Sequence, residues 1–401
     1  MSVGTPLHPR TSALNRKMQW REWSGYYASS VYADAHDIEY AAIREAAALI
    51  DVSPLYKYRV SGRDAGRLVD RVITRDATKL AVGQVYYTPW CDEHGKVIDD
   101  GTVHRLDATS YLWTAADPQS RWLALNARGL QVSIDDVSEE LAAIALQGPL
   151  SRAVLEAATG ESFAELRYFR RRETKLRDGR RRIPAGVSRT GYTGDLGYEL
   201  WVAAERATEA WDALIAAGAP FGVRPAGMLA LDVTRLEAGL ILLEVDYTSA
   251  RHALNPEQNY SPFELGLGRL VSFDKPEFVG RRALQAEARR GGPARRLVGV
   301  VLDWYGIEGL YTAQDLPPAI SPVVDRSQVP VFSPRGGQVG RITSHGWSPI
   351  LKQAIGLASV PPGYEAVGSR LEAEWTVEGR RGRVDAHVVP LPFLDLDRKR
   401  A

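Results

Sequence analysis

Apolar side chains recur at helical spacing near the start of the chain. Within residues 36–50, Ile38, Ala42 and Ala46 fall on one helical face, and Asp37 stands at the start of the run. Ala, Glu, Arg and Leu dominate this stretch and all favour helix. The pattern therefore predicts a helix over 36–50 with Asp37 as its N-cap.

Over the next hundred residues the spacing of apolar side chains changes. Residues 56–60 alternate in a way typical of a strand, and residues 62–74 form a helical pattern opened by Asp64. Residues 84–116 consist of short β-prone runs broken by turn residues, which indicates consecutive antiparallel hairpins, and residues 118–130 return to helix. Helices and hairpins without strand–helix alternation favour the α+β class over a doubly wound sheet.

After residue 143 a strand, a Gly-Pro turn and a helix follow, and then further strands and helices up to about residue 243. Beyond residue 290 the chain consists of short strands with turn residues between them, which is typical of a small all-β domain. Residues 283–296 are rich in Arg, Gly and Ala and are predicted to be a linker.

Composition narrows the class of protein. The 401 residues suffice for two or three domains, and 50 basic against 49 acidic residues give no support for nucleic-acid binding. Basic runs at 170–172, 180–182 and 289–296 are interpreted as solvated loops. The start lacks the apolar core of a signal peptide, and no window reaches about 18 apolar residues, so we expect a cytoplasmic protein without a membrane span.

Metal and nucleophile chemistry find little support in the sequence. Cys91 is the single cysteine, so an internal disulfide is impossible and a structural zinc site is not expected. The seven histidines are scattered without ligand spacing, and no metal site is predicted. Neither a phosphate loop nor a G-x-S-x-G nucleophile motif occurs.

Residues 188–200, "SRTGYTGDLGYEL", hold three glycines just before an apolar strand. A dinucleotide fingerprint needs G-x-G-x-x-G before a helix, so Gly191, Gly194 and Gly197 are interpreted as turn residues with φ > 0. Strand alternation puts Glu199 and Trp201 on one face. Glu199 is either a solvent-facing strand residue or a carboxylate aimed at a ligand with adjacent N–H donors, such as an aminopyrimidine or pterin edge.

"VIDDG" places two acids side by side at a strand edge. Adjacent strand residues face opposite ways, so at most one of Asp99 and Asp100 points into a shared pocket. The pair is either a turn-terminating feature or the source of one functional carboxylate. His104 and His345 sit in apolar strand contexts, where a half-buried structural histidine is the simpler interpretation.

Six stretches in this order resemble the folate-dependent aminomethyltransferase (glycine cleavage T-protein) family over about residues 20–395. They are "GQVYYTPWCDEHGKVIDDGTVHRL", "ALQGPLS", "SRTGYTGDLGYEL", "GMLALDVTRLEAG", "NPEQNYSPFELGLGRLVSFDKPEFVGRRAL" and "TSHGWSPILKQAIGLASV". The resemblance implies a three-domain cloverleaf around a central folate pocket. Domain 1 would comprise residues 1–55 and 143–285, a ferredoxin-like domain 2 residues 56–142, and a β-barrel-like domain 3 residues 291–401.

The resemblance also implies roles for individual residues. Asp100 matches the family's catalytic acid near the reactive nitrogens of tetrahydrofolate, and Tyr87 matches a folate-contacting tyrosine. Tyr192 and Glu199 match the pterin-site pair, and Arg189 in the same motif is expected to be structural. Tetrahydrofolate is therefore the expected cofactor.

Two positions depart from the family pattern: Leu231 stands where relatives have Arg, and His104 where glycine-cleavage enzymes have Tyr. His104 would add a titratable group near Asp100 that could move a proton at neutral pH. With a folate pocket altered at Leu231, these departures favour a demethylase of a small N-, O- or S-methyl compound that gives 5-methyltetrahydrofolate.

Two alternatives remain. One is an aminomethyltransferase that forms methylenetetrahydrofolate with a carrier-protein or oxidase partner, and the other is a non-catalytic folate-binding protein. The family's iron–sulfur maintenance branch carries a Cys motif where this chain reads "DKPEFVGRRAL", so that branch is disfavoured.

Overall fold

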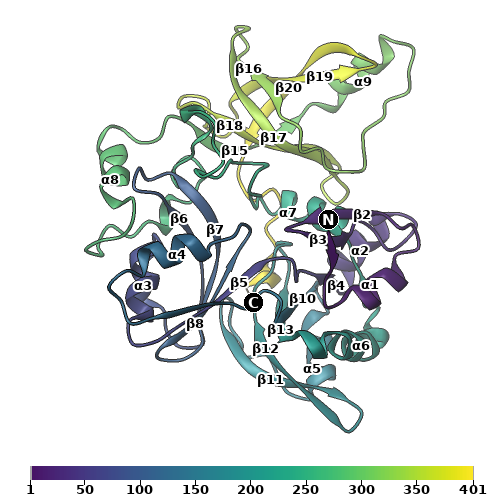
Figure 1. Ribbon diagram of the computed structural model, residues 1–401. Coiled ribbons are helices and arrows are strands. Elements are labelled where there is room, and N and C mark those ends of the chain that lie inside the picture. Colours follow the sequence, from purple (N-terminus) through teal and green to yellow (C-terminus); the bar gives the residue numbers. More distant parts are fainter. Residues whose placement is uncertain (1, 401) are drawn as a thin grey trace.

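The computed structural model describes residues 2–400. Figure 1 shows three lobes that meet near the middle of the molecule, with the barrel at the top and the two other sheets below it. Both ends of the chain lie close to that meeting point.

The first lobe combines segments from both sides of an insertion. Its six-stranded sheet has the order β11-β12-β13-β10-β4-β14, in which β4 pairs antiparallel with β10 although about 90 residues separate them. A small three-stranded sheet, β1-β3-β2, lies at the N-terminus. The strands are β1 (Val3–Gly4), β2 (Trp20–Trp23), β3 (Tyr26–Ser29), β4 (Ala48–Asp51), β10 (Leu141–Gln147), β11 (Arg171–Asp178), β12 (Arg181–Ser188), β13 (Gly197–Ala203) and β14 (Arg224–Pro225). The helices are α1 (His8–Leu14), α2 (His36–Glu45), α5 (Ser151–Thr159), α6 (Ala207–Gly218) and α7 (Met228–Glu237).

The inserted lobe is ferredoxin-like with one additional edge strand. Its elements run β5 (Tyr56–Ser61), α3 (Ala65–Val72), β6 (Val85–Cys91), β7 (Val97–Arg105), β8 (Ser110–Ala115), α4 (Ser120–Asn126) and β9 (Ser133–Asp136). The sheet order is β6-β7-β8-β5-β9 with every pair antiparallel. Without β6 this is the βαββαβ connectivity of a ferredoxin-like sheet. The hairpins expected over 84–116 are therefore confirmed as β6, β7 and β8.

The third lobe is a closed barrel, which confirms the all-β expectation for the C-terminal part. Its six strands close in the order β15-β18-β17-β16-β19-β20. They are β15 (Arg296–Leu302), β16 (Val329–Phe332), β17 (Gln338–Ser348), β18 (Gln353–Val360), β19 (Arg370–Val377) and β20 (Arg380–Val389). Helix α9 (Trp304–Thr312) packs against the barrel, and α8 (Arg281–Arg289) precedes it.

Three local predictions were wrong. Asp37 is not the N-cap, because helix α2 begins at His36 after Ala35 and Asp37 lies in its first turn. The helix expected over 36–50 ends at Glu45, because Ala48–Asp51 is fully buried and pairs with β10 as a strand, so tertiary pairing overrides helix propensity. The first half of the linker expected over 283–296 belongs to helix α8, because Leu284 is buried beside the turn at Gly95 and anchors the helix.

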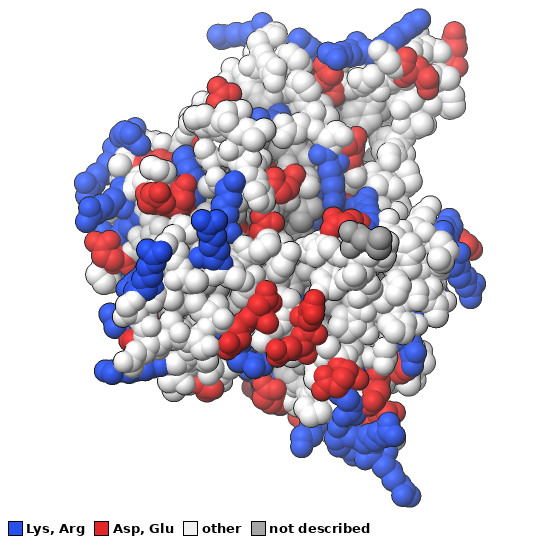
Figure 2. All heavy atoms as spheres, in the orientation of Figure 1, with Lys and Arg blue, Asp and Glu red and all other residues white. Residues whose placement is uncertain are grey.

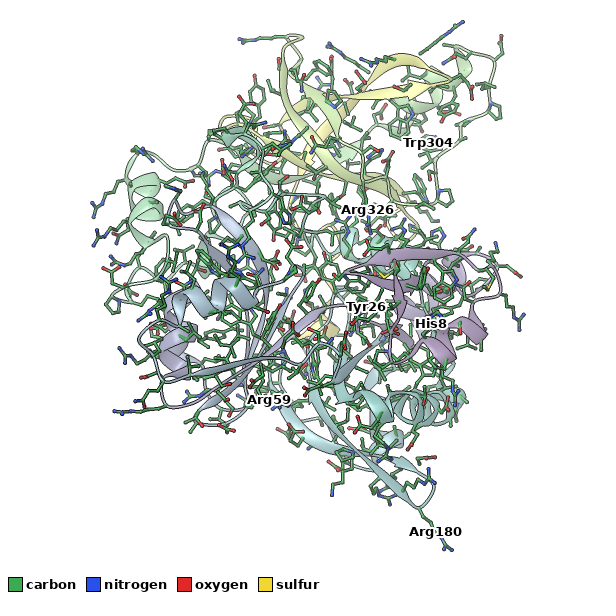
Figure 3. The ribbon with its side chains drawn as sticks, in the orientation of Figure 1. His8, Tyr26, Arg59, Arg180, Trp304 and Arg326 are labelled. Carbon is green, nitrogen blue, oxygen red and sulfur yellow. The ribbon has the colours of Figure 1, made fainter. Side chains whose placement is uncertain are left out.

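The basic run 180–182 lies at the tip of the β11–β12 hairpin. Figure 2 shows this tip as a blue cluster projecting from the molecule, and Figure 3 labels Arg180 there. Its position agrees with a solvated loop. The exact domain boundaries given above stay predictions. Among residues 2–400, no helix combines the length and apolar character needed to cross a membrane.

Candidate functional site

Strand β7 separates the two neighbouring acids, as alternation requires. Asp99 is fully buried and accepts hydrogen bonds from the N–H groups of Ala116 (3.1 Å) and Asp117 (3.0 Å) and from Gln119 Nε2 (3.2 Å). Asp99 therefore fixes the turn after β8. Asp100 points the other way, which leaves a single carboxylate for a site.

Asp100 lies between two phenols. Tyr87 Oη on β6 donates to Asp100 Oδ2 at 2.7 Å, and the Tyr247 hydroxyl donates to Asp100 Oδ1. Burial raises the pKa of Asp100 above its ordinary value, while the hydrogen bonds from Tyr247 and Tyr87 oppose that rise. The half-buried carboxylate can therefore exchange a proton closer to neutral pH than an exposed aspartate does.

Tyr192 lies close enough to Asp100 for the Asp100 charge to affect the pKa of the Tyr192 hydroxyl. Its hydroxyl donates to the carbonyl oxygen of Ile241. Burial raises the pKa of Tyr192, the Arg235 charge opposes this, and the Asp100 charge adds to it. Tyr87, Asp100 and Tyr192 thus form one group at the meeting of the inserted lobe and the first lobe.

Arg235 anchors the helix that faces this group. Its guanidinium donates to Asp232 (3.0 Å) on α7, to Asp246 (2.8 Å) in the following loop, and to Ser344 Oγ (2.9 Å) on the barrel strand β17. Because one fully buried side chain bonds the first lobe, the Tyr247 loop and the barrel, it holds the three parts of the site together.

The glycines of 188–200 serve packing more than turn geometry. Only Gly194 has a positive φ, of 71°. A Cβ on Gly191 would lie 2.0 Å from Gln147 Oε1, and one on Gly197 would lie 2.2 Å from the same atom. The expectation of φ > 0 was therefore wrong for these two glycines. They leave room for the buried Gln147 amide, whose Oε1 accepts a hydrogen bond from Thr193 (2.9 Å).

Glu199 shares a face of β13 with Trp201, opposite Tyr198 and Leu200, as the alternation predicted. Thr190 Oγ1 donates to Glu199 Oε2 at 2.5 Å, and Thr190 Oγ1 also lies 2.8 Å from Ser188 Oγ. Burial raises the pKa of Glu199 above its ordinary value, and the Thr190 hydrogen bond opposes the rise. The side chain stays partly exposed and is joined to Tyr192 through the short loop that starts at Thr190.

His104 does not fit the proton-transfer role expected for it. The side chain is fully buried, its ring packs edge-on against Trp201 with centroids 5.4 Å apart, and Nε2 lies 2.9 Å from Thr102 Oγ1. Burial and the Arg171 charge lower the pKa of His104 to about 3. The imidazole is therefore neutral at physiological pH and sealed from solvent, so a role as a proton donor is not supported.

Other residues of the site were placed only by the structure. Tyr247 follows no periodic pattern in the sequence, and it reaches Asp100 across 147 positions. Leu231 is 5% exposed and belongs to the apolar cluster against which Tyr192 packs. Position 231 therefore presents a hydrocarbon side chain instead of a charged one. Arg189 donates to the carbonyl oxygens of Leu166 (3.2 Å) and Lys399 (3.3 Å), in keeping with a structural role.

One group of potential metal ligands lies among the described residues, formed by Asp117, Glu244 and His252. His252 Nδ1 is 2.8 Å from Glu244 Oε1, and its Nε2 is 3.4 Å from Asp117 Oδ2. Both ring nitrogens thus already face a carboxylate, and the group is explained as an ion-pair cluster on the surface.

Comparison with known proteins shows the family of the chain. Residues 7–275 match the GCVT N-terminal domain, and residues 295–395 match the glycine cleavage T-protein C-terminal barrel domain. The aminomethyltransferase of Shouchella clausii is 37% identical over 360 residues, which cover 88% of each chain. The trimethylamine-oxide aldolase of Ruegeria pomeroyi is 35% identical over 411 residues, which cover 100% of this chain and 48% of that protein. This chain therefore spans about half the length of that relative.

A solved structure shows the same fold. The crystal structure of glycine cleavage system aminomethyltransferase T from Bartonella henselae superposes with a TM-score of 0.81 at 23% identity, over 98% of this chain and 99% of that one. With both domains matched and close relatives above 30% identity, the chain belongs to the glycine cleavage T-protein family of one-carbon transferases that use tetrahydrofolate.

Proposed function

We propose that this chain transfers a one-carbon unit to tetrahydrofolate at a site centred on Asp100. The observation that carries the proposal is the half-buried Asp100 carboxylate held between the hydroxyls of Tyr87 and Tyr247. A single carboxylate with a raised pKa, fixed by two donors, suits proton transfer to and from a substrate amine.

The residues present fit a reduced folate. An ionised carboxylate offers about four lone-pair sites, and Thr190 uses one of those on Glu199. The partly exposed side chain can therefore accept two parallel N–H bonds from the amino-pyrimidinone edge of a pterin. Tyr192 would supply a ring face between Glu199 and Asp100. We propose Tyr87, Asp100, Tyr192 and Glu199 as the folate-binding residues, with Asp100 catalytic.

Tetrahydrofolate supplies the amine nitrogens that accept the one-carbon unit. Asp100 would hold the proton that such an amine loses, and the Tyr87 and Tyr247 hydroxyls would keep the carboxylate in one orientation. Glu199 would fix the far end of the pterin, so that the reacting nitrogen stays beside Asp100. Burial of the group would keep water from competing for the carbon.

The chemistry of the site favours a carbon at the oxidation level of formaldehyde, with methylenetetrahydrofolate as product. Condensation of an aldehyde or iminium carbon with an amine needs proton transfer, which Asp100 can provide. Methyl transfer would also need an acid for the leaving group, and the neutral, sealed His104 does not serve as one. An aldolase acting on an N-methyl compound releases a carbonyl fragment, so the trimethylamine-oxide aldolase relative supports the same oxidation level.

Demethylation of a small N-, O- or S-methyl compound to 5-methyltetrahydrofolate is the second candidate. It is favoured by Leu231, an apolar side chain in the cluster against which Tyr192 packs, in place of the Arg of its relatives. In either case the carbon donor is proposed to come from an oxidase, a carrier protein or another amine-processing partner. A cytoplasmic location stays a prediction.

Product identity tests the proposal. The protein would be mixed with tetrahydrofolate and ¹³C-labelled formaldehyde, and in parallel with ¹³C-methyl donors, and products followed by ¹³C NMR. We expect methylenetetrahydrofolate to form faster than in the protein-free control. A methyl signal at N5 would establish the demethylase instead. Tight folate binding with no product above the control would refute both, in favour of a non-catalytic folate-binding protein.

A further inference from the structure

A second cavity lies outside the folate site, between the barrel and the segment that follows α9. Its volume is about 370 Å³, which is within the range of small-molecule sites. Residues of β17, β19 and the 319–330 segment form the wall. In Figure 1 this segment descends from α9 towards the first lobe, and Figure 3 labels Trp304, at the start of α9, and Arg326, within the segment.

Three rings line this cavity. Trp375 on β19 is half-buried, and the ring of His345 on β17 packs edge-on against it with centroids 5.8 Å apart. Tyr311 comes from the end of α9, and its hydroxyl donates to the carbonyl oxygen of Ala319 at 2.5 Å. That bond turns the phenol head towards the 319–330 segment. Aromatic faces beside a polar opening are the surfaces that bind organic cations.

The charge of the wall is negative. Asp325 and Glu374 are the acidic residues that line the cavity, and of the described residues that line it none is Lys or Arg. Glu374 precedes Trp375 on β19, so its carboxylate faces the opposite side of the strand and Asp325 supplies the charge. Burial raises the pKa of Asp325, but the hydrogen bond from Ser327 N (2.7 Å) and the His345 ring bring it below its ordinary value, so the carboxylate is charged. Burial lowers the pKa of His345, whose ring is therefore neutral at pH 7.

Nearby cations are occupied elsewhere. Arg21 and Arg326 line a neighbouring hollow that shares Asp325, and both pair with the buried Asp232, at 3.4 Å and 2.7 Å. Arg381 is 3.8 Å from Glu374 but its side chain is 79% exposed, so that pair is weak in water. Among residues 2–400, no Lys or Arg lies within ion-pair distance of Asp325, although Arg21 and Arg326 stand nearby and share Asp232 with Arg235.

We propose that this barrel cavity binds a small organic cation with apolar substituents on nitrogen, such as a methylated ammonium ion. Trp375, Tyr311 and His345 would surround the alkyl groups, and Asp325 would balance the charge. The site is separate from the folate site, because none of the residues around Asp100 lines it. The proposal therefore stands whether or not the proposed one-carbon activity is correct.

A pair of isosteric probes tests the proposal. Choline carries a trimethylammonium group, and 3,3-dimethyl-1-butanol replaces it with a neutral tert-butyl group of the same shape. Saturation-transfer NMR on the full chain would follow the methyl signal of each. We expect saturable binding of choline and at least roughly tenfold weaker binding of the alcohol, because only choline has a charge for the rings and the Asp325 carboxylate.

Variants assign the signal to the cavity. Asp325→Asn, which keeps an oxygen that can accept from Ser327 N, is expected to weaken choline binding roughly three- to tenfold, whereas Glu372→Gln on β19, outside the cavity and paired with Arg383, should leave it unchanged. Trp375→Leu should abolish the choline signal, and Tyr305→Leu, at an exposed ring outside the cavity, should not.

Three outcomes would overturn the proposal. The first is the absence of saturable choline binding up to roughly 50 mM, which lies well above a millimolar Kd. The second is equal affinity for the neutral alcohol. The third is choline binding that survives Asp325→Asn and is lost in Asp100→Asn, since that pattern would assign the cation to the folate site.

Discussion

Replacing Tyr247 by Phe removes one of the two hydroxyls that hold Asp100. The Tyr247 side chain is 2% exposed, and its ring packs 6.5 Å from that of Tyr260. Phe keeps this packing, so the substitution removes the hydrogen bond to Asp100 Oδ1 and little else. The effect therefore isolates what the phenol does for the carboxylate.

A hydrogen bond to a charged group contributes about 1.5–3 kcal/mol. Because about 1.4 kcal/mol corresponds to a factor of ten, losing the bond disfavours ionisation of Asp100 by roughly ten- to a hundredfold. The phenol stabilises the charged form, so its removal raises the pKa of Asp100 further above the ordinary value. If the ionised carboxylate is the active form, the pH below which activity falls should be higher in Tyr247→Phe than in the wild-type protein.

The assay is the pH profile of methylenetetrahydrofolate formation above the protein-free rate. Tyr260→Phe is the matched control, because Tyr260 is equally buried and its hydroxyl accepts from Arg341 (2.6 Å) instead of contacting Asp100. We expect the acid side of the profile to move to higher pH in Tyr247→Phe alone. An unchanged profile in Tyr247→Phe would refute the coupling between this phenol and Asp100.

Four further predictions follow from the described contacts. Gly197→Ala places a Cβ 2.2 Å from Gln147 Oε1 and should cost about 1–3 kcal/mol in urea unfolding, with much of the loss recovered in the double variant with Gln147→Ala. Glu199→Gln should weaken tetrahydrofolate binding roughly tenfold or more by calorimetry, and an unchanged Kd would contradict its pterin role. His104→Gln should leave the pH dependence of the rate near pH 7 unchanged, since burial holds the pKa of His104 at about 3. A shift of that dependence near pH 7 would support His104 as a proton donor. Burial lowers the pKa of Lys57 to about 8, so between about pH 8 and 10.5 the native state binds fewer protons than the unfolded chain. The free energy of unfolding should therefore rise with pH across that window more steeply than in Lys57→Met. Equal pH slopes in the two proteins would contradict the lowered pKa.

Much of the fold could be predicted because the period of the hydrophobic pattern records which face of each element is buried. The barrel strand β20 carries the alternation of a sheet with one buried face. Strands β6 and β7 show no such alternation, and they were predicted from their β-prone residues and the turn residues between them. Residues 48–51 were misassigned because all four side chains are buried, and a short fully buried strand has no period that separates it from helix.

Only some residues of the candidate site could be predicted from the sequence. Alternation correctly separated Asp100 from Asp99 and placed Glu199 opposite Tyr198, since both follow from strand geometry. Tyr247 lies in a loop without periodicity, so its contact with Asp100 depends on long-range packing. The roles of Gly191 and Gly197 depend on where Gln147 sits, which a glycine count does not reveal.

The rate of one-carbon transfer in Asp100→Asn tests the proposed role of this carboxylate most directly. Asn keeps the size of the side chain and removes its charge and proton affinity. Tetrahydrofolate binding, measured by calorimetry, is expected to persist because Glu199 and Tyr192 remain. The rate above the protein-free control should fall at least roughly hundredfold, as loss of a general base requires. Near wild-type turnover in this variant would contradict the assignment of Asp100 as the catalytic residue.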